Sequence, residues 1–114
     1  MIRAYIEELL DGLHINRRYT GRKQLVEAVL LAMEDEGRLL RMDRLIYAAV
    51  AEQCGGTSGS VSRNIRTVAT RTWDLYPELL QELAGYPLDR APTASEMVEL
   101  ILTHVQRTCP QVSR

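Results

Sequence analysis

Apolar side chains recur at intervals of three and four residues along almost the whole chain, which is the spacing of amphipathic helices. Glycine or proline interrupts the pattern, most clearly at Gly37, Gly55-Gly56, Pro77 and Gly85. Glycine adopts the left-handed conformation that ends many helices, and proline fits the first turn of a new one. The breaks therefore predict six helices, over about residues 2–13, 20–36, 43–54, 58–73, 77–84 and 94–105.

The start of the last predicted helix carries its own signal. Thr93 and Glu96 stand three residues apart, as in a capping box, where each side chain binds the other residue's backbone amide. Alternating apolar and polar residues, which are typical of strands, form no stretch of useful length. The predicted fold is a compact all-α bundle of about six helices in one domain, residues 1–114.

Composition agrees with this fold and excludes several classes of protein. The 114 residues are 46% hydrophobic and include no Phe, so the core must be mainly aliphatic, which favours helices over sheets. No apolar run approaches the roughly 20 residues that cross a bilayer, so we expect no membrane association. Cys54 and Cys109 lie far apart, which fits a reduced cytoplasm better than a disulfide framework.

Charge is distributed unevenly along the chain. The net charge is only −1, but two windows, residues 14–23 and 54–73, hold seven of the fourteen Lys and Arg residues and no acid. Such segregation can steer a polyanion to one face of a protein, whatever its total charge. Ordinary solvated surfaces also carry basic residues, so the charge pattern leaves both interpretations open.

Residues 48–73 have the spacing of a helix-turn-helix. Ala51 is small enough to let two helices cross closely, Gly55 permits a tight turn, and Val61 anchors the second helix against the first. The next apolar anchor, Ile65, comes one residue later than usual but falls on the same face. Helical hairpins that bind no DNA share this spacing, so it predicts the hairpin and not its function.

The predicted helix 58–73 has two contrasting faces. Its inward face consists of Val61, Ile65, Val68 and Thr72. Its outward side and its start are expected to bind DNA through Ser60, Ser62, Arg63, Arg66, Thr67 and Thr70. Arginine can donate two hydrogen bonds to guanine, and hydroxyl groups suit bases or phosphates. A solvated face normally mixes both signs of charge, whereas this one has no carboxylate before Asp74.

A second basic cluster spans the start of the helix expected from Thr20. If it lies on the same side as helix 58–73, its side chains contact backbone phosphate, an arrangement that the sequence leaves open. The side chains concerned are Arg17, Arg18, Arg22 and Lys23.

The order of several short blocks resembles one known family, the C-terminal DNA-binding domain of stage zero sporulation protein A, the response regulator that starts endospore formation. The resemblance spans about residues 15–105. It rests on residues 25–29 (LVEAV), 45–47 (LIY) followed by Ala51, 61–66 (VSRNIR), Trp73, 85–86 (GY) and 92–96 (PTASE).

The resemblance implies a sequence-specific DNA-binding transcriptional regulator with helix 58–73 in the major groove, acting on tandem sites as a possible dimer. In the family the contacts correspond to Arg63 and to Ser62, Arg66 and Thr70. Ser62 stands where the family usually has an acidic residue, and Thr70 where a longer polar side chain is usual. We therefore expect the docking to be shared and the preferred DNA sequence to differ.

Two further expectations come from the family. Its full-length members carry a receiver domain ahead of this region, so the chain is either cut from a longer regulator or a free-standing effector domain, which Met1 before an amphipathic helix favours. The family's segment after the recognition helix contacts RNA polymerase sigma factor, and Glu78, Gln81 and Glu82 occupy that place here.

Other function classes have little support in the sequence. His14 and His104 lie far apart, no nucleophile–histidine spacing stands out, and no glycine-rich phosphate loop follows a strand, so we expect no enzyme and no cofactor. The acidic cluster 34–36 fits a solvated helix end better than a metal site. The alternative that remains is a protein-interaction module that has kept the fold and lost DNA binding.

Overall fold

The apolar stripe predicted for the last helix forms the centre of the molecule. The structure, a computed structural model, describes residues 1–109. Its α-helices are α1 (Ile2–Gly12), α2 (Thr20–Glu34), α3 (Ala48–Cys54), α4 (Ser58–Leu75), α5 (Pro77–Ala84) and α6 (Ala94–Thr108). A 3₁₀ helix, η1 (Glu36–Arg41), and a π-helical turn, η2 (Met42–Tyr47), lead from α2 into α3. No strand occurs in residues 1–109, and the predicted all-α fold is confirmed.

The helices pack around α6, whose Met97, Ile101 and Val105 are fully buried. Against them lie fully buried aliphatic side chains of α1, α2 and α4, among them Leu10 and Leu25. Burial of each such side chain stabilises the fold by about 1.5–3 kcal/mol. The core is therefore shared by helices from both ends of the chain.

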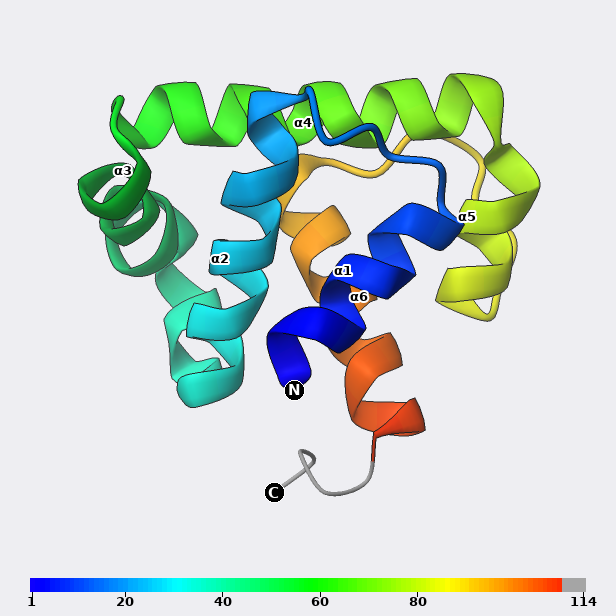
Figure 1. Ribbon diagram of the computed structural model, residues 1–114, viewed down its shortest axis with the longest axis horizontal. Helices are drawn as coiled ribbons and strands as arrows, with labels where there is room; N and C mark the ends of the chain where they lie inside the picture. The colour runs from blue at the N-terminus through cyan, green and yellow to red at the C-terminus, as the bar shows by residue number, and fades with distance from the viewer. Residues whose placement is uncertain (110–114) are drawn as a thin grey trace.

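Helix α4 lies along one edge of the molecule, uppermost in Figure 1. Helix α3 precedes it at one end and α5 follows at the other, while the start of α2 reaches α4 from below. The turn between α3 and α4 passes through Gly55 at φ +91°, a conformation that favours glycine and that the sequence predicted. One long side of α4 thus remains at the surface.

The helix starts show which side chains cap them. The predicted box at α6 is confirmed, because Thr93 Oγ1 accepts from the Glu96 amide at 3.1 Å and Glu96 Oε1 accepts from the Thr93 amide at 3.0 Å. A second box, not predicted, joins Thr57 and Ser60 at the start of α4. Helix α2 begins at Thr20, as expected, and its N-cap residue, Tyr19, makes no capping hydrogen bond through its side chain.

The segment between α2 and α3 differs from the prediction. Helix α2 ends at Glu34 rather than near Gly37, because the side chain of Asp35 accepts from the Gly37 amide and starts the 3₁₀ turn. The π turn that follows changes the register of the core-facing side chains. Ile46 and Tyr47 are buried, while Leu45, which the helical period of the predicted helix 43–54 assigns to the inward side, is 43% exposed.

Within residues 1–109, no helix combines the length and apolar character needed to cross a membrane.

Candidate nucleic-acid interface

The inward face of α4 holds the helix firmly in the bundle. Val61 and Ile65 are fully buried, and Val68 and Thr72 are 1% and 4% exposed, as the helical period predicted. The buried hydroxyl of Thr72 is satisfied, because its Oγ1 donates to the Val68 carbonyl oxygen at 2.8 Å. Four inward positions over three turns fix the rotation of α4 about its own axis, and so fix which residues face outward.

The outward face of α4 is basic and polar. Arg63, Arg66, Thr67 and Thr70 are all exposed. Thr67 Oγ1 donates to the Arg63 carbonyl oxygen at 3.0 Å. The ion pairs found in residues 1–109 include neither the Arg63 nor the Arg66 guanidinium, so both remain available to a ligand.

The serines at the start of α4 have different surroundings. Ser60 Oγ accepts from the Thr57 amide at 2.9 Å and lies 3.0 Å from the Thr57 carbonyl oxygen, so its hydroxyl already serves the cap. Ser58 Oγ donates to the Asp43 carbonyl oxygen at 2.9 Å and ties α4 to η2. Ser62 is half-buried, at the side of the outward face.

Helix α2 crosses α4 at Gly21, where the backbones of the two helices lie in close contact. A Cβ on Gly21 would overlap the Asn64 carbonyl oxygen and would lie 2.9 Å from Val68 Cγ2. Beside this contact, Asn64 Nδ2 donates to Oε1 of the buried Gln24 at 3.1 Å. Only glycine fits at this crossing, and its presence brings the start of α2 against the middle of α4.

The chain before α2 runs alongside the second half of α4. Arg71 Nη1 donates to the Tyr19 hydroxyl at 3.3 Å, and the Arg71 guanidinium carbon lies 5.9 Å from the centre of the Tyr19 ring. Further along, the rings of His14 and Tyr76 lie 4.6 Å apart. The two basic windows therefore lie on the same side of the molecule, a question that the sequence left open.

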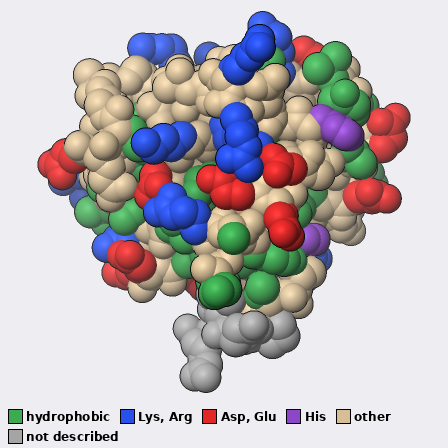
Figure 2. All heavy atoms as spheres, in the orientation of Figure 1, with side chains coloured by type: hydrophobic (Ala, Val, Ile, Leu, Met, Phe, Trp, Pro, Cys, Tyr) green, Lys and Arg blue, Asp and Glu red, His purple; other side chains and the backbone are tan. Residues whose placement is uncertain are grey.

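We call residues 13–19 the flanking loop. Arg17 and Arg18 on this loop and Lys23 on α2 are exposed. The Arg18 amide donates to Asn16 Oδ1 at 2.8 Å, which holds the loop in a tight turn. The Arg17 guanidinium lies 3.5 Å from an Asp11 carboxylate oxygen and 3.7 Å from a Glu7 one. Figure 2 shows Lys and Arg side chains along the upper edge, where α4 lies in Figure 1.

Arg22 corrects the prediction. It was expected to contact phosphate, but only 3% of its surface is exposed. Its guanidinium is surrounded by the Glu7 and Asp11 carboxylates and the Ile15 carbonyl oxygen. Charged side chains are rarely buried unless they are paired, and composition alone does not reveal such a pair.

Arg71 was not among the predicted contacts. It lies in the same basic window as Arg63, one turn and a half beyond Arg66. Because it is exposed and contacts Tyr19, it belongs to the basic surface formed by α4 and the flanking loop. The signal available in the sequence was its place in an acid-free window. Its neighbour in space, Tyr19, comes from a distant part of the chain.

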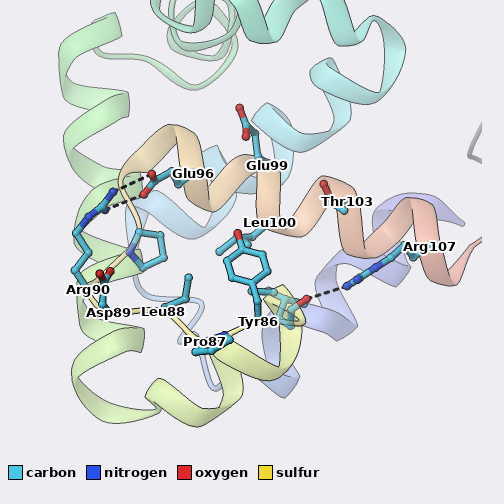
Figure 3. Close-up of a pocket in the computed structure, with 13 residues that line it drawn as sticks. Tyr86, Pro87, Leu88, Asp89, Arg90, Glu96, Glu99, Leu100, Thr103 and Arg107 are labelled. Atoms are coloured by element: carbon cyan, nitrogen blue, oxygen red, sulfur yellow. Dashed lines mark hydrogen bonds and ion pairs between the residues drawn. The ribbon is translucent and has the colours of Figure 1, made fainter.

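The rest of the described chain offers no comparable constellation. A hollow of about 410 Å³ lies between α6 and the segment 86–92, with Tyr86, Leu100 and Thr103 on its walls (Figure 3). Its Arg90 binds the Glu96 carboxylate and lowers the pKa of that group to about 2. Residues 1–109 contain no group of three His, Cys, Asp or Glu side chains arranged to hold a metal ion.

One partly buried histidine lies near this region. Burial, and then the charge of Arg107, lowers the pKa of His104 below its ordinary value, and its Nδ1 has no hydrogen-bond partner within residues 1–109. It lines a shallow hollow together with leucines and the side chains of Glu8 on α1 and Glu82 on α5.

A helix-turn-helix whose second helix presents exposed arginines, with a basic loop beside it, defines a class of nucleic-acid-binding domains. The chain belongs to the family described as Sporulation initiation factor Spo0A C terminal, whose sequence model matches residues 6–105. This is the family of the DNA-binding effector domains of sporulation regulators, and it is a family of transcription regulators rather than of enzymes. The resemblance predicted from the sequence is confirmed, and the match also includes most of α1. A search of curated proteins found no match.

Proposed function

We propose that this domain is a sequence-specific transcriptional regulator that places α4 in the major groove of DNA. The observation that carries the proposal is the outward face of α4, where Arg63 and Arg66 are exposed and enter no internal ion pair within residues 1–109. An α-helix fits the width of the major groove, and unpaired guanidinium groups match the acceptors that guanine presents there.

The proposed roles follow from position on the helix. Arg63 is near the middle of the outward face and reads a base, while Arg66, Thr67 and Thr70 contact neighbouring bases or phosphates. Ser62, at the side of this face, contributes to the base preference. The Ser60 hydroxyl is engaged in the cap, so its proposed contribution is to hold the first turn of α4 in place.

The flanking loop supplies the proposed backbone contacts. Arg18, Lys23 and Arg71 are exposed around the crossing of α2 and α4, and Arg17 adds a fourth charge that two acids partly offset. Contacts of this kind fix the register of a protein on the duplex and carry no sequence information themselves.

The first experiment measures binding to a random-sequence duplex over a series of salt concentrations. We expect binding at low salt and a steep loss of affinity as salt rises, because each phosphate contact releases counterions. Selection of bound sequences from a random duplex pool then gives the preferred site. Arg41→Ala is the control variant and should bind DNA as the wild type does. Arg41 is an exposed arginine of η1, beyond the far end of α2.

Binding that is absent even at low salt contradicts the proposal and favours the alternative, a protein-interaction module. The support for that alternative is the acidic balance of the chain outside its two basic windows. Binding without any enrichment of a sequence in the pool contradicts the specific part of the proposal only.

We further propose that α5 offers a contact for RNA polymerase sigma factor when the domain is bound to DNA. Glu78 and Glu82 are exposed on α5, next to α4 in the chain, and their charge suits a basic partner. Gln81 instead accepts from the Leu88 amide at 2.8 Å and holds the following segment in place. Transcription in a purified system tests this: Glu78→Gln with Glu82→Gln should reduce activation and leave DNA affinity unchanged.

Occupation of tandem sites as a dimer is also proposed. Measurement of the mass of the complex on DNA with one and with two copies of the selected site decides it.

A further inference from the structure

Arg22 is the only Lys or Arg in residues 1–109 that is almost completely buried. Its Nη2 donates to Glu7 Oε1 at 2.7 Å and to the Glu7 carbonyl oxygen at 3.1 Å, and its Nε donates to the same carboxylate oxygen at 3.2 Å. Nη1 donates to the Ile15 carbonyl oxygen at 2.6 Å and lies 2.9 Å from Asp11 Oδ1. Four hydrogen bonds, an ion pair and an exposed fraction of 3% leave the guanidinium inaccessible to a phosphate.

These contacts join three separate parts of the chain. Glu7 and Asp11 belong to α1, Ile15 belongs to the flanking loop, and Arg22 itself lies in the first turn of α2. The preceding residue, Gly21, is the one whose backbone touches α4. A displacement of the Arg22 side chain therefore acts at the point where the flanking loop meets the proposed DNA-binding helix.

Arg17 shares the two carboxylates that hold Arg22. Its guanidinium lies 3.5 Å from Asp11 and 3.7 Å from Glu7, with 66% of the side chain exposed. As long as Arg22 neutralises both acids, their attraction for Arg17 is weak and Arg17 remains available. Without the Arg22 charge, both acids attract Arg17 inward and away from a phosphate.

We propose that Arg22 is a positioning residue for DNA binding: it fixes the flanking loop beside α4 and keeps Arg17 available, without contacting DNA. The inference rests on the proposed function. A guanidinium is required for it, because the donors of lysine all lie on one nitrogen atom and cannot occupy the separate positions from which Nε, Nη1 and Nη2 of Arg22 reach their partners.

The variant that tests this is Arg22→Lys, which keeps the charge and loses the planar set of donors. Hydrogen exchange in the free protein should become roughly tenfold faster or more at the amides of Ile15 and Tyr19, which are bonded to the Leu10 and Asn16 carbonyl oxygens. DNA affinity, measured well below the unfolding temperature, should fall by roughly tenfold or more. The slope of log affinity against log salt should lose about 0.9 for each phosphate contact given up.

Arg41→Lys and Arg18→Gln provide the controls. Arg41 is an exposed arginine of η1, outside the proposed interface, so Arg41→Lys should leave exchange, affinity and slope close to those of the wild type. Arg18→Gln should leave exchange unchanged and reduce the slope by about 0.9, as expected for a direct phosphate contact.

Three results overturn the inference. Unchanged exchange of the Ile15 and Tyr19 amides in Arg22→Lys means that Arg22 does not hold the loop. Faster exchange with unchanged DNA affinity means that its role is structural only. An unchanged slope of log affinity against log salt in Arg22→Gln means that the Arg22 charge does not keep Arg17 available.

Glu7→Gln applies if Arg22→Lys does not fold, because it keeps an acceptor oxygen and removes only the charge. Faster exchange of the same two amides supports the inference, and unchanged exchange overturns it. Failure of the wild type to bind any DNA is a separate result. It contradicts the proposed function, while the exchange measurement still decides whether Arg22 holds the flanking loop.

Discussion

Arg22 and Arg63 come from the two basic windows of the chain and have opposite surroundings. Arg22 is 3% exposed and all of its donors face protein acceptors, whereas Arg63 is exposed on the outward face of α4. An arginine side chain therefore stabilises the fold at position 22 and is available to bind a ligand at position 63. Burial and the nearest acids decide between the two uses.

Arg63→Ala tests recognition at a single residue. We expect a loss of about 1–3 kcal/mol on the selected DNA site and a relaxed preference at one base position, because a guanidinium that reads guanine discriminates by about that much. Binding assays with the selected site and its single-base variants measure both effects. An equal loss on every sequence would identify Arg63 as a phosphate contact instead.

Gly21→Ala tests the crossing of α2 and α4. Since the added Cβ would overlap the Asn64 backbone and crowd Val68, the helices must separate, and we expect a loss of stability of about 1–3 kcal/mol. Denaturant unfolding measures it. Gly12→Ala is the control, because a Cβ there meets nothing within 4 Å, and its stability should equal or exceed that of the wild type. Equal stability of both variants would show that the crossing tolerates a side chain.

At the scale of elements, the helix boundaries marked by local chemistry were predictable from the sequence. The Thr93–Glu96 box starts α6, and Gly85 in a left-handed conformation ends α5, as the pattern indicated. The segment from η1 to η2 was not predictable from the apolar spacing, because its 3₁₀ and π turns depart from the α-helical period. Leu45 illustrates the error: it continues the apolar stripe in sequence and lies outside it in the structure.

The capping box of α6 has a defined dependence on pH. The hydrogen bond from Arg90, followed by the one from the Thr93 backbone, lowers the pKa of Glu96 to about 2, below its ordinary value of 4.5. Its contribution to stability is therefore fully present above pH 4.5 and is lost as the pH falls toward 2. We expect Glu96→Gln to be less stable than the wild type at neutral pH and the difference to shrink under acid conditions. Thermal unfolding across this range measures it, and a constant difference would contradict the assignment.

The outward face of α4 was predictable from local sequence, whereas the position of the flanking loop beside it was not. The helical period alone assigns Arg63 and Thr70 to the face opposite Val61. The position of the flanking loop depends on Gly21 meeting Asn64, residues that are far apart in the sequence. The proximity of the loop, the role of Arg71 and the burial of Arg22 therefore required the structure.

For the molecule as a whole, the placement of charge matters more than its sum. The net charge is −1, yet four exposed basic side chains flank the outward face of α4: Arg71 on α4 itself, Arg17 and Arg18 on the flanking loop, and Lys23 on α2. If these make the phosphate contacts, the slope of log affinity against log salt should be about −3 to −4. Titrations at several salt concentrations measure it. A slope near zero would mean that the bordering side chains stay away from the DNA backbone.

The division of α4 into a buried side and an exposed side has a consequence for variation. Val61, Ile65 and Val68 fix the helix in the bundle, and none of them reaches the outward surface. Positions 63, 66, 67 and 70 can therefore be randomised together while the domain keeps its fold. A library at these four positions would turn the domain into a set of readers that share one scaffold and differ in the DNA sequence they recognise.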